Sequence, residues 1–291
     1  MRIQTLSIIA GSEACNARCP FCISRMTPPH GVELREPEVN WRNFDLACRL
    51  AARCGVTTAM ITGKGEPTLY PNQITRFLGA LAPHGFPFVE LQTNGILFSE
   101  RKRDYRPILE EWYRLGLTTL ALSIVDHRPE KNHAIYTPHR QSYIDLPELI
   151  GRLHGIGFSI RLAAVLLDGF IDSPAELWSL VEFASDLGVE QLTVRPVNRP
   201  VHAADPDVAA WTDAHRLPPE RLEMIRQWLD SAGALVMTLV HGGLVYDVEG
   251  QNVCLTDSLT LAPSTEDVRQ LIFFPDGHLR YDWQRKGAIL L

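Results

Sequence analysis

Two hydrophobic patterns alternate along most of the chain. Short apolar runs rich in β-branched residues predict buried strands, and stretches in which apolar residues recur every three or four positions predict amphipathic helices. The predicted strands span residues 3–10, 57–62, 88–92, 118–123, 159–166 and 191–195. The predicted helices span residues 43–54, 73–81, 106–115, 146–154 and 175–187. Strands that alternate with helices are typical of a parallel sheet, so the pattern predicts an α/β fold, either open or curled into a partial barrel.

The pattern changes in the last third of the chain. The elements predicted there are a Pro-, Asp- and His-rich loop at 200–217, a helix at 219–232, an apolar run at 234–240 and a hairpin that turns at Asp276-Gly277. This change divides the chain into a core over residues 1–198 and a small α+β extension over residues 199–291. We expect the extension to close the substrate side of the core.

The composition is that of an ordinary globular protein, with 45% hydrophobic and 21% charged residues. No apolar run approaches the roughly 18 residues of a membrane span. The net charge is −6 and the Lys and Arg residues are scattered, which argues against binding to nucleic acid or anionic lipid. We therefore expect neither a membrane nor a nucleic-acid partner.

The first 15 residues, "MRIQTLSIIAGSEAC", look superficially like a lipoprotein signal. Their apolar stretch is only about five residues long, however, against the usual ~7–15 of a signal peptide. We interpret the stretch as a buried first strand and expect a cytoplasmic protein. In a reducing compartment, the six cysteines indicate metal binding or catalysis rather than disulfides.

Three of these cysteines are closely spaced. Cys15, Cys19 and Cys22 lie in "CNARCPFC", a C-x₃-C-x₂-C pattern that follows the first predicted strand. Thiolates in such a loop can bind zinc or an iron–sulfur cluster, but structural zinc and ferredoxin-type clusters both normally use four protein ligands. The other cysteines are distant in sequence. A cluster held by three cysteines would keep one iron open for an exogenous ligand.

This spacing resembles the signature of the radical S-adenosylmethionine (SAM) superfamily, in which an aromatic residue usually precedes the last cysteine, as Phe21 does here. The later predicted strand ends agree with the resemblance. The positions that match SAM contacts of the family are Gly65, Glu66 and Pro67 after the second strand, Gln92 and Asn94 after the third, Ser123 after the fourth, Arg140 in the loop beyond it, and Val197 after the sixth. Lys64 departs from the family pattern, which often has a glycine there. The resemblance covers residues 1–198 and implies a partial (β/α)₆ TIM-like barrel of parallel strands.

The resemblance also implies a chemistry. Cys15, Cys19 and Cys22 would bind one [4Fe–4S] cluster, and SAM would bind its open iron. An external one-electron reductant of the flavodoxin or ferredoxin type would drive cleavage of SAM to a 5′-deoxyadenosyl radical, which takes hydrogen from the substrate. The only cysteine after Cys54 is Cys254, so we expect no second cluster. Relatives that modify peptides often carry extra clusters, so a small molecule or a nucleotide is favoured over a peptide.

Two other functions stay open. The chain could be a nucleotide-modifying dehydratase of the viperin type, which shares a layout with a single cluster. It could also be a non-catalytic interaction protein that binds zinc or an iron–sulfur cluster and has lost SAM.

Cys254 has two interpretations of its own. A buried free cysteine commonly behaves as a small hydrophobic residue. Alternatively, Cys254 could return a hydrogen atom to the substrate in an epimerisation, as a lone C-terminal cysteine does in some radical SAM epimerases. Asp247 and Asp257 lie nearby in sequence and would suit a cationic substrate.

Overall fold

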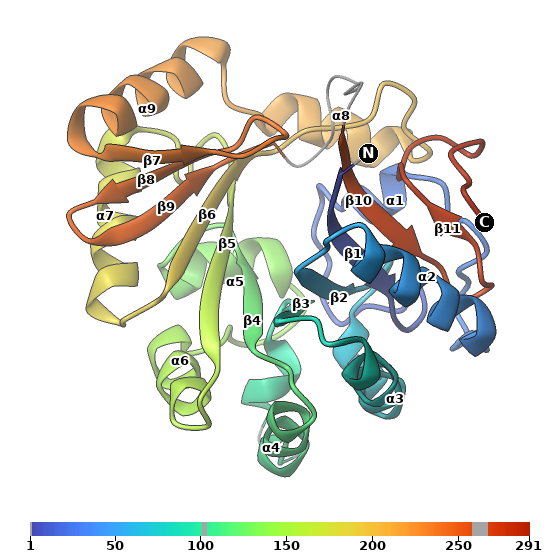
Figure 1. Cartoon of the computed structure of the whole chain (residues 1–291). Helices are drawn as coiled ribbons and strands as arrows, with labels where there is room; N and C mark the ends of the chain where they lie inside the picture. Colours follow the sequence, from blue (N-terminus) through green and yellow to red (C-terminus); the bar gives the residue numbers. More distant parts are fainter. Residues whose placement is uncertain (1, 101–103, 258–266) are drawn as a thin grey trace.

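The computed structural model describes residues 2–100, 104–257 and 267–291 (Figure 1). Its centre is a run of six parallel strands, each paired with the next along the chain. These strands are β1 (Arg2–Ile9), β2 (Thr58–Thr62), β3 (Phe88–Thr93), β4 (Thr119–Ile124), β5 (Ser159–Leu166) and β6 (Gln191–Pro196). The six predicted strands and the parallel α/β fold are therefore confirmed.

Helices connect these strands and lie outside the curved sheet, as α3, α4 and α6 show clearly in Figure 1. The connecting helices are α1 (Ile23–Met26), α2 (Trp41–Arg53), α3 (Pro71–Leu81), α4 (Arg106–Arg114), α5 (Pro129–Tyr136), α6 (Leu146–His154) and α7 (Pro174–Asp186). Each long helix buries its apolar face; in α2, for example, Phe44, Ala47 and Ala51 are buried. The N-terminus of α2 is fixed by Asn40, whose side chain accepts a hydrogen bond from the backbone N–H of Asn43.

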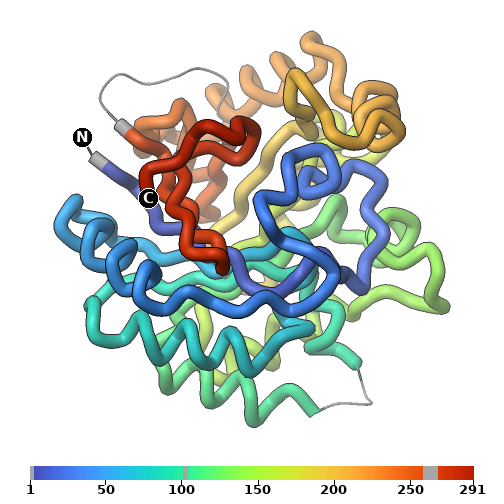
Figure 2. Tube along the Cα trace, turned by 90° about the vertical axis from the view of Figure 1, so that its right-hand side faces the viewer, coloured from blue at the N-terminus to red at the C-terminus, as the bar shows by residue number. Residues whose placement is uncertain are grey.

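The part of the chain after residue 198 adds strands to both edges of the central sheet. It contains α8 (Pro206–His215), α9 (Pro219–Ala232), β7 (Ala234–Thr238), β8 (Leu244–Val248), β9 (Gln251–Leu255), β10 (Asp267–Phe273) and β11 (Leu279–Arg280). Strand β9 pairs in parallel with β6, and β10 pairs in parallel with β1, so a strand from near the C-terminus lies beside the first strand (Figures 1 and 2). The strand order is β11-β10-β1-β2-β3-β4-β5-β6-β9-β8-β7. The sheet is thus an open, partial barrel.

Two predictions for this part have different outcomes. The hairpin is confirmed, because β10 and β11 are antiparallel across the turn at Asp276-Gly277. The loop predicted at 200–217 is wrong, since α8 occupies its centre. The Asp205 side chain accepts hydrogen bonds from the first backbone N–H groups of α8, and Pro206 fits the first helical position, so Pro and Asp start a helix here. The core boundary at residue 198 stays a prediction.

Among the described helices, none is long and apolar enough to cross a bilayer.

Candidate active site

The loop of residues 10–22, which contains Cys15, Cys19 and Cys22 and is called the cysteine loop below, follows β1. Hydrogen bonds connect it to the adjacent helices. The Gln73 side chain accepts from the backbone N–H of Gly11 at 2.6 Å, and the hydroxyls of Ser12 and Tyr70 are 2.6 Å apart. Further along, the backbone N–H of Arg18 donates to the carbonyl of Tyr136 at 2.9 Å. These contacts hold the loop against α3 and α5 at the carboxyl ends of the strands, where parallel α/β folds place their chemistry.

The three thiols of this loop lie close enough to influence one another electrostatically. Burial raises the pKa of Cys15 to about 11, with Glu66 and Cys22 adding to the shift. Burial, then Cys22 and Cys15, raise the pKa of Cys19 well above its ordinary value. Bound iron would stabilise the thiolates that this environment disfavours, and sulfur is the ligand that iron–sulfur clusters require. Among the described residues no three His, Cys, Asp or Glu side chains form a group that could hold a single metal ion. The all-sulfur donor set of Cys15, Cys19 and Cys22 fits the thiolate ligation of an iron–sulfur cluster.

The turn after β2 rests directly on the cysteine loop. The backbone N–H of Glu66 donates to the carbonyl of Ala14 at 2.9 Å. A Cβ at position 65 would lie 2.1 Å from that carbonyl oxygen, so only glycine permits this approach. Pro67 then begins a short 3₁₀ turn, η1 (Pro67–Leu69). Gly65 and Pro67 thus have a structural role in joining the two loops.

The Glu66 carboxylate ties the end of β2 to the end of β3. One oxygen accepts from the Thr68 N–H at 3.1 Å, the Thr68 hydroxyl at 2.7 Å and the Thr93 hydroxyl at 2.6 Å. The other oxygen accepts from the Asn94 N–H at 2.9 Å. Glu66 is 3% exposed, and burial raises its pKa. Its contact with SAM stays a prediction.

The polar residues at the end of β3 point in two directions. The Asn94 amide donates to the Asn16 side chain at 2.7 Å and approaches the Cys15 sulfur at 3.9 Å, so it supports the cysteine loop. The Gln92 amide donates to Glu90 at 3.3 Å, and Gln92 lines the barrel interior. The structure therefore brings Asn94 to the cysteines and Gln92 to the cavity.

Lys64 stabilises the short helix α1, which begins directly after Cys22. Its ammonium group donates to the carbonyls of Ser24 at 2.9 Å, Thr27 at 3.2 Å and Pro28 at 3.1 Å, and to the Thr27 hydroxyl at 2.8 Å. Burial lowers the pKa of this amine to about 8. Lys64 therefore stands where the family often has glycine. Its side chain stabilises the C-terminal part of α1, a role that could not be predicted from the sequence.

A cavity of about 290 Å³ lies inside the partial barrel. It is bounded by Ser24 and Thr27 next to the cysteine loop and by β2, β3, β5, β6, β9 and β10 around the sides. Cys254 on β9 lines this cavity. Sequence analysis missed Arg161 and Arg195, which also line it. Their signal was an arginine inside an otherwise apolar strand, a position where an unpaired charge is costly.

Comparison with protein families gives a match over residues 9–184 to the model described as "Radical SAM superfamily". The chain belongs to the radical SAM superfamily. It is therefore an enzyme of the kind that uses a [4Fe–4S] cluster and SAM, and the resemblance and the cofactors inferred from the sequence are confirmed.

Curated radical SAM relatives include two GTP 3′,8-cyclases. The protein from Aquifex aeolicus (strain VF5) is 28% identical over 189 residues, covering 62% of this chain and 53% of that relative. The protein from Stenotrophomonas maltophilia (strain R551-3) is 29% identical over 170 residues, covering 57% and 48%. The chain thus spans about half the length of these relatives.

Solved structures of other proteins share the fold. SuiB from Streptococcus suis, solved with the precursor peptide SuiA, aligns with a TM-score of 0.60 and 16% identity, covering 96% of this chain and 59% of that one. A radical SAM methyltransferase from Sphaerobacter thermophilus aligns with a TM-score of 0.55 and 19% identity, covering 87% and 66%. At such identities the likeness concerns the fold alone.

The remaining predicted SAM contacts lie in different surroundings. Val197 is buried in an apolar cluster that Cys19 and Phe21 pack against, so these three residues are brought together. Ser123 is half-buried on β4, level with Ala163 of β5. Arg140 instead forms an ion pair with Glu100 at 2.6 Å, which occupies its guanidinium. All four SAM-contact assignments, including that of Phe21, stay predictions.

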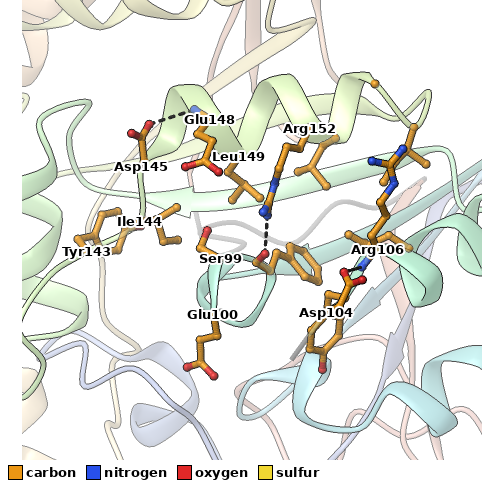
Figure 3. Close-up of a pocket in the computed structure, with 16 residues that line it drawn as sticks. Ser99, Glu100, Asp104, Arg106, Tyr143, Ile144, Asp145, Glu148, Leu149 and Arg152 are labelled. Atoms are coloured by element: carbon orange, nitrogen blue, oxygen red, sulfur yellow. Dashed lines mark hydrogen bonds between the residues drawn. The ribbon is translucent and has the colours of Figure 1, made fainter. Parts of the chain in front are cut away.

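A second cavity of about 670 Å³ lies outside the barrel, between α4 and α6 (Figure 3). Its polar contacts serve the local backbone. The Asp145 side chain caps α6 by accepting from the Glu148 N–H, and Arg152 donates to the Phe98 carbonyl. None of the predicted site residues lines it. The predicted site residues therefore lie apart from this outer cavity.

Proposed function

We propose that this radical SAM protein removes a hydrogen atom from a small molecule bound inside the partial barrel. The observation that supports this is the 290 Å³ cavity, which extends from the helix after Cys22 to Cys254 on the opposite part of the sheet. A substrate there would lie beside the SAM site at the strand ends. The non-catalytic alternative is set aside because the chain belongs to an enzyme superfamily.

Cys15, Cys19 and Cys22 are the residues that would hold the cluster. When bound and reduced by an external flavodoxin- or ferredoxin-type protein, the cluster supplies the electron that splits SAM into methionine and a 5′-deoxyadenosyl radical. The turn at Gly65 and Glu66 would position the SAM amino group beside the cysteine loop. The apolar cluster around Val197 would keep water from the adenosyl group.

Cys254 would supply the returning hydrogen atom. Once the adenosyl radical has taken hydrogen from one face of a substrate carbon, the Cys254 S–H bond would break and deliver hydrogen to the other face. The resulting thiyl radical would be restored to the thiol by one electron from the external reductant and one proton. Its position in the cavity wall supports this role, and burial raises its pKa, which keeps the sulfur protonated.

The experiment is anaerobic turnover of reconstituted, reduced protein with SAM, in which 5′-deoxyadenosine and methionine are quantified. We expect both products in equal amounts. Cys254→Ala should still form them, and Cys48→Ala, which changes a buried cysteine on α2, serves as a matched control. Absence of 5′-deoxyadenosine from well-reconstituted wild-type protein would contradict the proposed function.

A nucleotide substrate is the second candidate. The similarity to GTP 3′,8-cyclases over more than half of this chain favours it, and it keeps open the nucleotide-modifying dehydratase considered from the sequence. The same turnover assay with added nucleotides would discriminate, because a true substrate stimulates 5′-deoxyadenosine formation.

A further inference from the structure

We propose that the barrel interior binds a small anionic substrate, a carboxylate or a phosphate monoester, through Arg161, Arg195 and Arg269. This inference rests on the proposed function, since the anion would be the substrate of that site. It specifies the charge and the size of the substrate, neither of which could be inferred from the sequence.

The register of the sheet places these side chains around one space. Arg195 on β6 pairs with Val165 of β5, and Arg161 lies four residues before Val165, so both point to the same face of the sheet. Arg269 reaches the cavity from β10. Three arginines from separate strands therefore converge on the cavity that Cys254 also lines.

The charge of this cavity is opposite to that of the whole chain. The chain carries 34 acidic and 28 basic side chains, yet no Asp or Glu in its described part lines the cavity. Glu90 pairs with Arg161 from β3 and neutralises one of the three arginines. Arg269 donates to the backbone carbonyl of Asp257, and the negative charge of Asp257 offsets part of the cost of burying this arginine. Neither Asp247 nor Asp257, which suggested a cationic sugar from the sequence, lines the cavity, so an anion is favoured there.

Arg195 is the group that most requires a partner. In the described part of the chain its Nε is buried without a hydrogen bond, and no carboxylate pairs with its guanidinium. Burial, and then the positive charges of Arg161 and Arg269, lower the pKa of Arg195, and Tyr136 and Glu90 offset only part of this. Leaving a buried charge unpaired is costly, whereas a carboxylate or phosphate matches the planar guanidinium with two parallel hydrogen bonds. An anion at this point would satisfy Arg195 and screen it from its two neighbours.

The size of the cavity limits the anion to a small metabolite. At about 290 Å³ it lies just below the roughly 300–1,000 Å³ found for ligand pockets. A nucleoside triphosphate would have to extend beyond it. The neutral polar groups around the arginines, such as Thr193 and Gln270, could orient a small polar body.

The test uses reconstituted protein with SAM bound and titrates inorganic phosphate, acetate and GTP by calorimetry. We expect phosphate or acetate to bind, and Arg195→Gln to weaken that binding at least about tenfold, which corresponds to about 1.4 kcal/mol. Arg49→Gln is the matched control, since Arg49 is an exposed arginine on α2 paired with Asp45. Without added anion, Arg195→Gln should also raise the melting temperature, because it removes an unpaired buried charge.

Several results would overturn the proposal. One is equal anion binding by Arg195→Gln and Arg49→Gln. Another is binding of GTP without any binding of phosphate or acetate. A third is that Arg195→Gln loses SAM binding but not anion binding, which would place Arg195 at the SAM carboxylate. SAM cleavage in the absence of substrate separates this inference from the proposed function. If 5′-deoxyadenosine forms but no anion binds, only the inference fails. If an anion binds but no SAM is cleaved, only the proposed function fails.

Discussion

Replacing Glu66 with glutamine should weaken the hydrogen bonds that connect the end of β2 to the end of β3. The glutamine oxygen can still accept from Thr68 and Thr93, but its NH₂ group then faces the Asn94 N–H, and two donors oppose each other. One charge-assisted hydrogen bond is lost and a buried N–H is left unpaired. Each effect costs about 1–3 kcal/mol, partly offset because a buried charge is removed, so we expect a net loss of about 2–3 kcal/mol.

Urea unfolding of the folded chain measures this loss directly. The matched control is Glu110→Gln, because Glu110 is an exposed carboxylate that pairs with Arg106 one helical turn away on α4. Such an exposed pair contributes about 0.3–0.5 kcal/mol. If Glu66→Gln and Glu110→Gln destabilise the protein equally, the connection between β2 and β3 does not depend on the Glu66 carboxylate and our reasoning is refuted.

The same variant separates the structural role of Glu66 from its predicted contact with SAM. If the carboxylate also binds the SAM amino group, SAM affinity should fall in Glu66→Gln and in Ser123→Ala, while the iron content stays unchanged. SAM affinity equal to wild type in both variants would refute the two assigned contacts and leave Glu66 with its structural role alone.

Three further predictions concern other parts of the site. Lys64→Met should increase hydrogen exchange of the amides at 23–27, because four acceptors lose their ammonium donor; unchanged protection would contradict this. Burial, then Arg269, lower the pKa of His241 to about 4, so the unfolded chain takes up the proton first as pH falls. Stability should therefore drop between about pH 6.5 and pH 4 by more than in His241→Gln, as urea midpoints would show, and equal pH dependence would contradict the assignment. Cys254→Ala should cleave SAM and remove substrate hydrogen without forming epimerised product, and full turnover would exclude the hydrogen-donor role.

The sequence predicted the central sheet because its signals are local. Each strand is a short apolar run and each long helix has one apolar face, as in α2, so periodicity alone locates them. Helix α8 was missed although its start signal, Asp205 followed by Pro206, is also local. The abundance of Pro and Asp favoured a loop. However, Asp205 and Pro206 can also begin a helix, as they do here, where apolar residues such as Val208 follow and are buried.

The contacts of the site were harder to predict because they depend on distant pairings. Lys64 finds its acceptors 36–40 residues earlier in the chain. Cys254 reaches the cavity because β9 pairs with β6 and places it level with Thr193. Within the described residues, the buried Nε of Arg195 is left without a hydrogen bond, and its place in the cavity depends on the register of β5 against β6. None of these pairings can be recognised from the spacing of apolar residues in the sequence.

The central claim is that Cys15, Cys19 and Cys22 hold one [4Fe–4S] cluster in an enzyme that cleaves SAM. The most direct measurement is an iron and acid-labile sulfide count after anaerobic reconstitution, made on wild-type protein and on the variant with all three cysteines changed to alanine. We predict about four irons and four sulfides per chain in the wild type and almost none in the variant. Zinc without sulfide, about eight irons per chain, or a full cluster in the variant would contradict the account.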